Sequence, residues 1–501
     1  MNRRDRRARN KSIARGVAAM RDAAVASDDP GRLLAIADKL LSVGKPADAK
    51  AVLERARALA PSDAGVSARL AYALAATGDV KSAERLYRDL SATRPTDASL
   101  LTNHAILLQK IGRLDEAKET LKRALDAEPT HANALYHYAC MLSDSREREE
   151  AVRVFNAAIV QLRKLSAGTR PDLPDILVKL ANAELWIGNA HAAIGILDRA
   201  LSLRPDHALA AARRGLALAK LRRYPEAIAS LKRAAATAKG YAEASRAVGE
   251  LLMEVGEYSE AARHLRRALR HKPQDQFARY LLAGATGEDI PDAPPPGYVE
   301  ALFDEYAATF DRHLVEVLKY RAPEQLCAAV LEAAGAAAAN WKAVDLGCGT
   351  GLCGPLIKPA TSFLIGVDRS AGMLDKARER GVYDLLERKD LVEALLDHDG
   401  ELDLAISADV LLYIGNLEPT FRACARALKP AGLFAFTCEA HDGSHYVLGA
   451  TGRYQHSRSY LDGLARDFGF ATLIYRTIVG RYQDGVPVPF HLYVLRREVS
   501  R

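Results

Sequence analysis

The chain has 501 residues, of which 49% are hydrophobic and 27% are charged, so it is long enough to fold into at least two domains. Its formal net charge is +7, but residues 1–15 carry seven basic side chains against the single acid Asp5. Six of the seven net charges therefore lie in this tail, and the overall charge gives no clear indication of a nucleic-acid site.

The N-terminal segment, residues 1–27, is predicted to be a basic, disordered tail, with contact to nucleic acid or acidic lipid as the alternative. It lacks the apolar region of a signal peptide, and no uncharged apolar stretch reaches the length of a membrane span. We therefore expect a cytoplasmic location. The six cysteines are scattered without a C-x-x-C pair, which predicts reduced thiols and neither disulfides nor a zinc site.

An internal repeat fills the first half of the chain. Seven alanines recur at spacings of 34, 34, 34, 42, 34 and 34 residues, and each follows a turn residue by five positions and precedes a bulky residue by four. A turn, a small residue that lets two helices approach and an apolar side chain beside it predict one helix pair in each repeat. The alanines are Ala49, Ala83, Ala117, Ala151, Ala193, Ala227 and Ala261. The turn residues are Gly44, Gly78, Gly112, Arg146, Gly188, Arg222 and Gly256, and the bulky residues are Leu53, Tyr87, Leu121, Phe155, Leu197, Leu231 and Leu265.

This pattern resembles the tetratricopeptide repeat, as seven repeats within residues 28–283. The resemblance implies an all-α solenoid, because one repeat cannot bury its own apolar face, and it implies that a protein or peptide partner binds in the solenoid groove. Self-association, or a role as a spacer, is the alternative. The fourth repeat has eight extra residues, assigned to 165–174, which lengthen or interrupt its second helix as a functional loop or a tolerated insertion.

A proline-rich segment, residues 284–297, follows the repeats. Its four prolines prevent a helix and favour an extended, semi-rigid linker, which places the domain boundary near residue 290. Residues 298–318 then show helical apolar spacing and contain Tyr306 and His313.

A short apolar run at the start of the last 160 residues ends in an acid and three closely spaced glycines, Asp345, Gly347, Gly349 and Gly351. Glycines permit the positive φ angles of a tight turn from a strand into a helix and let a ligand approach the backbone. Asp368 ends the next apolar run, where its carboxylate could accept the hydroxyls of a ribose. Residues 349–354 also spell G-x-G-x-x-G, so a dinucleotide-dependent oxidoreductase is one alternative. A merely structural α/β domain is another.

The sequence VDLGCGTG at 344–351, with an acid at the end of the second strand, resembles the class I S-adenosylmethionine-dependent methyltransferases. The resemblance implies an α/β Rossmann-like, seven-stranded domain over residues 298–501 that binds S-adenosylmethionine. Strands are expected at 344–346, 363–367, 385–388, 402–407, 432–438, 472–478 and 491–495. The resemblance assigns cofactor binding to Asp345, Gly347, Cys348, Gly349, Gly351, Asp368, Asp390 and Tyr306. An N-cap is the alternative for Asp390, and ordinary helix packing is the alternative for Tyr306.

Three residues are candidates for the catalytic site. Residues 404–413 resemble the family's fourth motif, which places Asp409 and Tyr413 at the carboxyl end of a strand and facing the methyl-transfer site. The segment 452–457 is expected to be a loop, and it resembles a G-R-Y-x-H-S element of repeat-linked methyltransferases. This resemblance makes His456 the candidate general base or substrate contact, with a surface or helix-start histidine as the alternative. His441 and His445 have no third ligand nearby in the sequence, so no metal is expected.

The sequence therefore predicts S-adenosylmethionine-dependent methyl transfer to a protein, peptide or small-molecule acceptor, with the solenoid recruiting the partner. No motif identifies the acceptor, since the signatures of base, glutamine and carbon methylation are missing. The main alternative is a non-catalytic scaffold whose methyltransferase-like domain still binds the cofactor.

Overall fold

The computed structural model describes residues 16–144, 147–168, 172–237, 241–306, 319–335, 338–483 and 485–498. It divides into two compact units, residues 1–240 and 241–501. Each unit is described by itself below. Within the described residues, no helix is both long and apolar enough to cross a bilayer.

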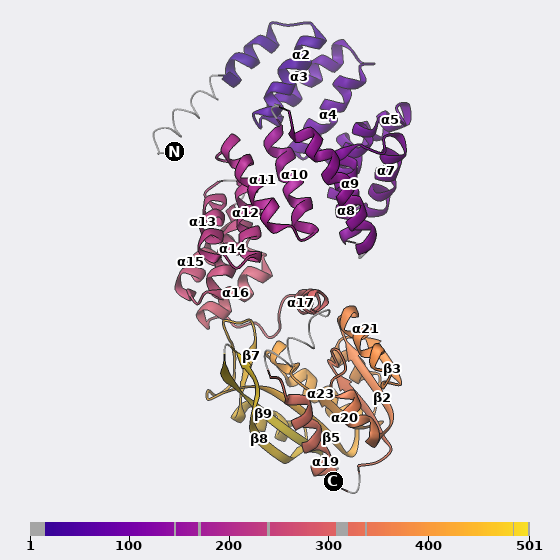
Figure 1. Cartoon of the computed structure of the whole chain (residues 1–501), viewed down its shortest axis with the longest axis vertical. Coiled ribbons are helices and arrows are strands. Elements are labelled where there is room, and N and C mark those ends of the chain that lie inside the picture. Colours follow the sequence, from indigo (N-terminus) through magenta and orange to yellow (C-terminus); the bar gives the residue numbers. More distant parts are fainter. Residues whose placement is uncertain are drawn as a thin grey trace. The chain divides into compact units, whose positions relative to one another are not determined.

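The first unit is an array of antiparallel helix pairs (Figure 1). Its helices are α2 Pro30–Ser42, α3 Pro46–Leu59, α4 Ala64–Thr77, α5 Val80–Thr93, α6 Ala98–Lys110, α7 Leu114–Ala127, α8 Ala132–Asp144, α9 Arg148–Ser166, α10 Leu173–Trp186, α11 Ala190–Leu203, α12 Ala208–Lys220 and α13 Tyr224–Ala235. Aspartates such as Asp63 and Asp97 begin several first helices by accepting backbone N–H groups. Together with α14 and α15 of the second unit, these helices make the seven predicted pairs.

The predicted repeat register is confirmed. All seven repeated alanines are fully buried, and the seven bulky residues four positions later are at most 2% exposed. Every predicted turn glycine has a positive φ angle, and Arg222 adopts the same left-handed conformation with φ of 57°. Arg146 lies outside the described residues. Helix pairs approach so closely that a Cβ added at Gly215 would lie 2.6 Å from Cγ of Leu231.

The extra residues of the fourth repeat lengthen its second helix. Helix α9 has 19 residues, whereas α7 and α11 at the same place in their repeats have 14. This agrees with the expected position of the insertion.

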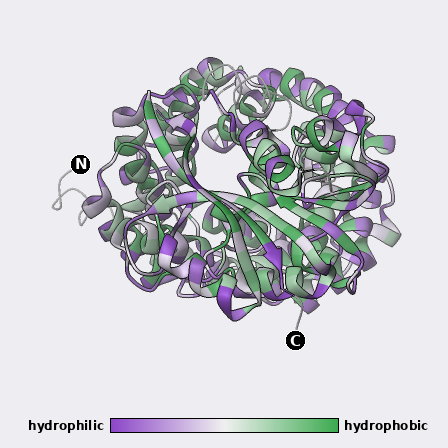
Figure 2. Cartoon of the chain, turned by 90° about the horizontal axis from the view of Figure 1, so that it is seen from below, coloured by the Kyte–Doolittle hydropathy of each residue, from purple (hydrophilic) through white to green (hydrophobic). Residues whose placement is uncertain are grey.

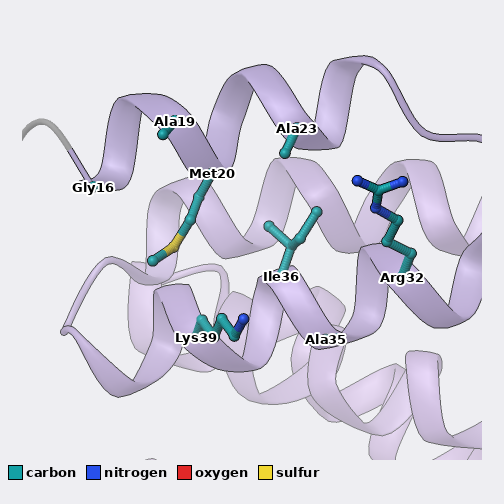
Figure 3. Close-up of a pocket in the computed structure, with 8 residues that line it drawn as sticks. All are labelled: Gly16, Ala19, Met20, Ala23, Arg32, Ala35, Ile36 and Lys39. Atoms are coloured by element: carbon teal, nitrogen blue, oxygen red, sulfur yellow. The ribbon is translucent and has the colours of Figure 1, made fainter.

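Part of the predicted N-terminal tail is helical. Residues 16–25 form a helix whose Val17 and Ala24 are buried against the first pair, α2 and α3. Apolar residues three and four apart supply the face that packs, so the prediction of a disordered tail does not hold for this segment. Between this helix and α2 lies a cavity of 420 Å³, where Met20 and Ile36 face each other beside Arg32 and Lys39 (Figure 3).

The second unit joins the last helices of the repeat array to an α/β domain. Its helices are α14 Tyr241–Glu254, α15 Tyr258–His271, α16 Gln276–Thr286, α17 Tyr298–Tyr306, α19 Ala322–Ala334, α20 Gly354–Ile357, α21 Ala371–Arg380, α22 Leu391–Leu396, α23 Glu418–Ala427 and α24 Arg458–Asp467. Its strands are β1 Trp341–Leu346, β2 Thr361–Asp368, β3 Leu385–Arg388, β4 Leu402–Ser407, β5 Leu428–His441, β6 Tyr446–Leu448, β7 Tyr454–Ser457, β8 Phe470–Gln483 and β9 Val486–Arg497.

Seven of these strands form the predicted sheet, in the order β3-β2-β1-β4-β5-β9-β8. Strands β1 to β5 are parallel, and β9 runs antiparallel to both of its neighbours. Alternate residues enter two cores, with Ala343 and Leu404 packing on the side of α19, and Val344 and Ala405 on the side of α23. The strands are accordingly hydrophobic along much of their length (Figure 2). The α/β doubly wound architecture is therefore confirmed.

The hairpin of β6 and β7 was not predicted. Strand β7 runs parallel to the end of β5, at Ala440 and His441, and β6 pairs with β7. Residues 454–457, expected to be part of a loop, therefore form a strand whose side chains alternate between two faces.

The proline-rich segment is bound to the α/β domain instead of standing free. The carbonyl oxygen of Asp292 accepts the backbone N–H groups of Gly415 and Asn416 at 2.8 and 3.0 Å. The hydroxyls of Tyr446 and Tyr454 donate to Asp292 and to the Pro291 carbonyl. The compact units divide near residue 240, so the predicted domain boundary near residue 290 lies within the second unit.

Candidate active site

The loop after β1 has three glycines that serve different purposes. All three have positive φ angles, 68° at Gly347, 54° at Gly349 and 85° at Gly351. A Cβ at Gly347 would lie 2.5 Å from Val410, and one at Gly351 would lie 2.9 Å from the ring of Tyr383. Among the described residues, apart from its two chain neighbours, no atom lies within 4 Å of a Cβ built at Gly349. Two glycines therefore make room for protein side chains, whereas no described side chain packs on Gly349, so a ligand can approach its backbone.

Asp368, at the end of β2, holds this loop. Its carboxylate accepts the backbone N–H of Gly349 at 2.9 Å and that of Ser370 at 2.8 Å. Burial raises the pKa of Asp368 above its usual value, and the two backbone hydrogen bonds oppose that rise. Asp304 of α17 binds the residues that follow Asp368. Its carboxylate accepts the Ser370 hydroxyl at 2.6 Å and the Gly372 N–H at 3.2 Å.

Asp345 is buried within the sheet. It is 2% exposed, and its Oδ2 accepts the hydroxyl of Tyr383 at 2.7 Å. Burial raises the pKa of Asp345 to about 7, against the lowering effect of the tyrosine hydrogen bond. Cys348 packs with Leu374 and Ala377 of α21, and burial raises the pKa of its thiol. Both side chains thus support the loop from within the protein.

The remaining predicted cofactor residues have mixed outcomes. Asp390 is the N-cap of α22, since its Oδ1 accepts the Val392 N–H at 2.9 Å. Its other oxygen lies 3.5 Å from Arg369. Tyr306 ends α17, but its side chain lies outside the described residues, as does His313 altogether.

The helix after the glycine loop is short. Helix α20 has four residues and continues only as a three-residue 3-10 turn, Lys358–Ala360. Dinucleotide-binding sites place the pyrophosphate at the N-terminus of a full helix, where the helix dipole favours negative charge. The G-x-G-x-x-G match at 349–354 therefore lacks the structural context that a dinucleotide site requires.

A buried group of charges lies at the carboxyl ends of β4 and β5. Nη1 of Arg481, on β8, donates to both carboxylate oxygens of Asp409 at 2.9 and 3.0 Å, and its Nη2 binds Glu439. The Arg481 side chain is 3% exposed and that of Glu439 is 5% exposed. We call Asp409, Glu439 and Arg481 the arginine–carboxylate cluster.

The backbone at Asp409 adopts an unusual conformation. Its φ angle is 60°, which non-glycine residues rarely adopt, and its N–H donates to the Thr437 hydroxyl at 3.0 Å. Such strain is retained where surrounding contacts impose it, often at functional sites. Here Arg481 and Thr437 impose it.

Tyr413 lies beside this cluster, within reach of the charge of Arg453. Burial raises the pKa of Tyr413 above its usual value, and Arg453 opposes that rise. The phenol therefore stays protonated near neutral pH and can donate a hydrogen bond. Phe303 of α17 packs edge-on against the Tyr413 ring, with centroids 5.2 Å apart, so α17 borders both Asp368 and Tyr413.

His456 lies on the opposite side of its strand. Its Nε2 is 3.0 Å from the Gly415 carbonyl oxygen, and its ring stacks on Tyr460. The preceding residue, Gln455, points the other way and donates to Glu439 at 3.3 Å. Burial lowers the pKa of His456 to about 4. Because neighbouring side chains of a strand alternate, these contacts favour a structural histidine over the predicted general base.

The structure thus brings Asp409 and Tyr413 together and adds residues that the sequence did not single out. Arg481, Glu439 and Gln455 come from three different strands, and Arg453 precedes β7. For Arg453 and Gln455 a signal was available, since both lie in the segment 452–457 that drew attention to His456. In the part of the chain that the structure describes, no group of side chains could hold a metal ion.

Together the fold and the site define an open α/β domain with a glycine loop and an acid at adjacent strand ends, which is where such sheets bind nucleotide-like cofactors. The family described as "Methyltransferase domain" matches residues 344–436. Two families described as "Tetratricopeptide repeat" match residues 40–103 and 218–285, and residues 102–166 and 178–242. The chain therefore combines tetratricopeptide repeats with a C-terminal methyltransferase domain.

Curated relatives match the methyltransferase part of other proteins. A ubiquinone biosynthesis O-methyltransferase of Chelativorans sp. (strain BNC1) is 32% identical over 154 residues, which cover 27% of this chain and 60% of that protein. One from Methylococcus capsulatus is 31% identical over 119 residues, 23% of this chain and 50% of that protein. The chain spans about half to three fifths of the length of these relatives.

Among solved structures, an S-adenosylmethionine-dependent methyltransferase from Mesorhizobium loti is 24% identical, with 34% of this chain and 96% of that chain covered and a TM-score of 0.27. YrrB, described as a tetratricopeptide-repeat protein with an unusual peptide-binding site, is 22% identical, with 39% and 96% covered and a TM-score of 0.28.

The cofactor that a methyltransferase domain implies is S-adenosylmethionine, and the residues present fit it. The bare backbone at Gly349 leaves room for a ligand. The Asp368 carboxylate, which already receives two backbone N–H groups, retains lone pairs that can accept ribose hydroxyls. Both features lie at the ends of adjacent parallel strands, β1 and β2.

Proposed function

We propose that the protein transfers a methyl group from S-adenosylmethionine to an acceptor bound against Tyr413, Arg453 and the arginine–carboxylate cluster. The observation that supports this most directly is the side-by-side placement of two sites on one sheet edge. The glycine loop and Asp368 lie at the ends of β1 and β2, and Asp409 follows β4, the other neighbour of β1.

S-adenosylmethionine, when bound, supplies an electrophilic methyl group on a sulfonium sulfur. The protein then needs chiefly to align the acceptor, and alignment alone can contribute about 7 to 11 kcal/mol. Asp368 and the backbone at Gly349 hold the cofactor, and Tyr413 and Arg453 donate hydrogen bonds to the acceptor. Arg481 holds Asp409 in place, and Asp409 is the carboxylate that takes a proton from the acceptor.

The acceptor is proposed to be a protein, a peptide or a small molecule. The two curated relatives described above are O-methyltransferases by name, which favours an acceptor oxygen. A hydroxyl loses its proton on methylation, and Asp409, with Glu439 beside it, gives the site the carboxylates that such a step needs.

The repeat array is proposed to recruit the partner that carries the acceptor. Neighbouring repeats present polar side chains that contact one another across their first helices. Lys179 of α10 donates to Asn133 of α8 at 2.6 Å, and Asn182 donates to the hydroxyl of Tyr136 at 3.2 Å. Such a surface suits a peptide backbone, which offers both donors and acceptors.

Calorimetric titration of the full chain with S-adenosylmethionine and S-adenosylhomocysteine tests the cofactor, with NADH as the competing ligand. Asp368→Ala should weaken binding about 10- to 150-fold, because a hydrogen bond to a charged group contributes about 1.5 to 3 kcal/mol. Asp375→Ala on the exposed side of α21 is the matched control and should bind as the wild type does. Binding of NADH alone would overturn the proposal.

Transfer of a tritium-labelled methyl group to separated protein and small-molecule fractions then tests the activity. Tyr413→Phe should lower incorporation while the affinity for S-adenosylhomocysteine stays unchanged. Cofactor binding with no incorporation into any fraction would favour the non-catalytic scaffold.

The recruitment part has its own test with a labelled protein acceptor. Lys179→Glu should raise the KM for that protein and leave the affinity for S-adenosylhomocysteine unchanged, whereas Lys122→Glu, an exposed position on α7, should change neither. An unchanged KM in Lys179→Glu would contradict recruitment through these helices.

A further inference from the structure

Helix α16, which follows the seventh repeat, contacts the turn between β6 and β7. The hydroxyl of Tyr280 donates to the carbonyl oxygen of Gly452 at 2.7 Å. Gly284, one turn further along α16, lies so close that an added Cβ would be 3.1 Å from the Gly449 carbonyl oxygen. The helix therefore touches both ends of this turn, and the close contact favours a residue without a side chain.

Apolar packing reinforces these contacts. Tyr280 and Ala283 are buried together with Leu448 of β6 and Tyr454 of β7. The Tyr280 and Tyr454 rings lie 6.3 Å apart. The hairpin is thus held between α16 and the proline-rich segment, since the hydroxyl of Tyr454 also donates to the Pro291 carbonyl at 2.8 Å.

The clamped turn carries Arg453. The N–H of Gly449 donates to the Arg453 carbonyl at 2.8 Å, and that of Gly452 donates to the Gly449 carbonyl at 3.0 Å. Gly452 has a φ angle of 71°, and a Cβ there would lie 3.6 Å from the Tyr280 ring. The turn therefore fixes the backbone from which the Arg453 side chain extends.

Arg453 reaches from this turn into the candidate methyl-transfer site. Its Nη1 donates to the side-chain oxygen of Gln483 on β8 at 3.4 Å, and its charge acts on the phenol of Tyr413. The negative charges of Glu439 and Asp409 raise the pKa of Arg453. The hydrogen bond from Tyr280 of α16 therefore ends at Gly452, the residue directly before Arg453.

We propose that Tyr280 is a positioning residue for methyl transfer. The last helix of the repeat array holds the turn at 449–453 so that Arg453 meets Tyr413 at the place where the acceptor binds. This inference rests on the proposed function, which identifies the surroundings of Tyr413 and Arg453 as the place of methyl transfer. It goes beyond that function by making the end of the repeat array a component of the methyl-transfer site, and not only a tether for a partner.

The inference predicts that a fragment beginning near residue 290 has an incomplete acceptor site. Such a fragment keeps the glycine loop and Asp368 but lacks Tyr280 and Gly284. Activity of the fragment would therefore not report on partner recruitment alone, so the test uses the full chain.

The experiment places 3-fluorotyrosine at position 413 and follows its fluorine resonance during a pH titration. Arg453→Met removes the cation that lowers the pKa of residue 413, so the pKa should rise. Tyr280→Phe keeps the buried ring and removes only the hydrogen bond to Gly452, and it should raise the same pKa by part of that shift. Tyr258→Phe on α15, which is 43% exposed, is the control and should titrate as the wild type does.

The outcomes separate this inference from the proposed function. A titration of Tyr280→Phe that coincides with the wild type, or an unshifted Arg453→Met, would overturn the inference. Each variant is also titrated with S-adenosylhomocysteine. A Kd within about twofold of the wild-type value shows that the cofactor-binding site is intact. If the wild type fails to bind S-adenosylhomocysteine, the proposed function fails, while a shifted titration in Tyr280→Phe still supports the positioning of Arg453.

Discussion

Replacing Asp345 by asparagine should remove a pH-dependent loss of stability from the methyltransferase domain. Asp345 is 2% exposed, and its partner is the uncharged hydroxyl of Tyr383. Burial raises its pKa from 3.8 to about 7. Asparagine has the same shape, and its side-chain oxygen can still accept the Tyr383 hydrogen bond.

The direction of the pKa shift of Asp345 decides whether the unfolding free energy rises or falls with pH. A carboxyl group whose pKa is higher in the folded state than in the unfolded chain binds its proton more tightly when folded. Its stabilising contribution is complete below the unfolded pKa and is lost as the pH rises through the folded value. The shift of Asp345 corresponds to about 4 kcal/mol in total, of which about 2 to 3 kcal/mol is lost between about pH 5 and about pH 8.

Tryptophan fluorescence can measure this in the full chain. The protein has two tryptophans, and Trp341 lies in β1, the strand that contains Asp345. With Trp186→Phe in both proteins, Trp341 reports unfolding of the methyltransferase domain alone. From about pH 5 to about pH 8, the wild-type domain should lose about 2 to 3 kcal/mol of unfolding free energy relative to Asp345→Asn. A difference between the two proteins that does not change with pH would refute the reasoning.

Two further predictions concern packing and buried charge. Arg481→Met removes the cation that pairs with the buried Glu439 and the partly buried Asp409, so the domain should lose about 3 to 5 kcal/mol of unfolding free energy. Arg476→Met breaks a half-exposed ion pair and should cost at most about 1 kcal/mol. Equal losses in urea unfolding would contradict the burial argument. In the repeats, Gly215→Ala places a Cβ 2.6 Å from a buried leucine and should lower the thermal unfolding temperature, while Gly195→Ala, which meets no atom within 4 Å, should raise it, because alanine is favoured over glycine in helices by about 1 kcal/mol.

The sequence by itself determined the features that depend on local periodicity. The spacing of the repeated alanines gave the helix pairs, since a buried position recurs wherever the same local pattern does. Alternating apolar strands and helices predicted the α/β sheet, and the glycine loop with Asp368 predicted the cofactor end of the site. Each of these signals lies within a few residues of the feature that it predicts.

Only the tertiary structure decided which distant residues meet. Arg481 reaches Asp409 across 72 residues, and Tyr280 reaches Gly452 across 172, so no local pattern pairs them. The structure favours a structural role for His456 for a related reason. A segment expected to be a loop is a strand, and strand alternation turns His456 away from the cluster that Gln455 contacts. Sheet register and long-range packing set these choices, and they depend on the whole folded chain.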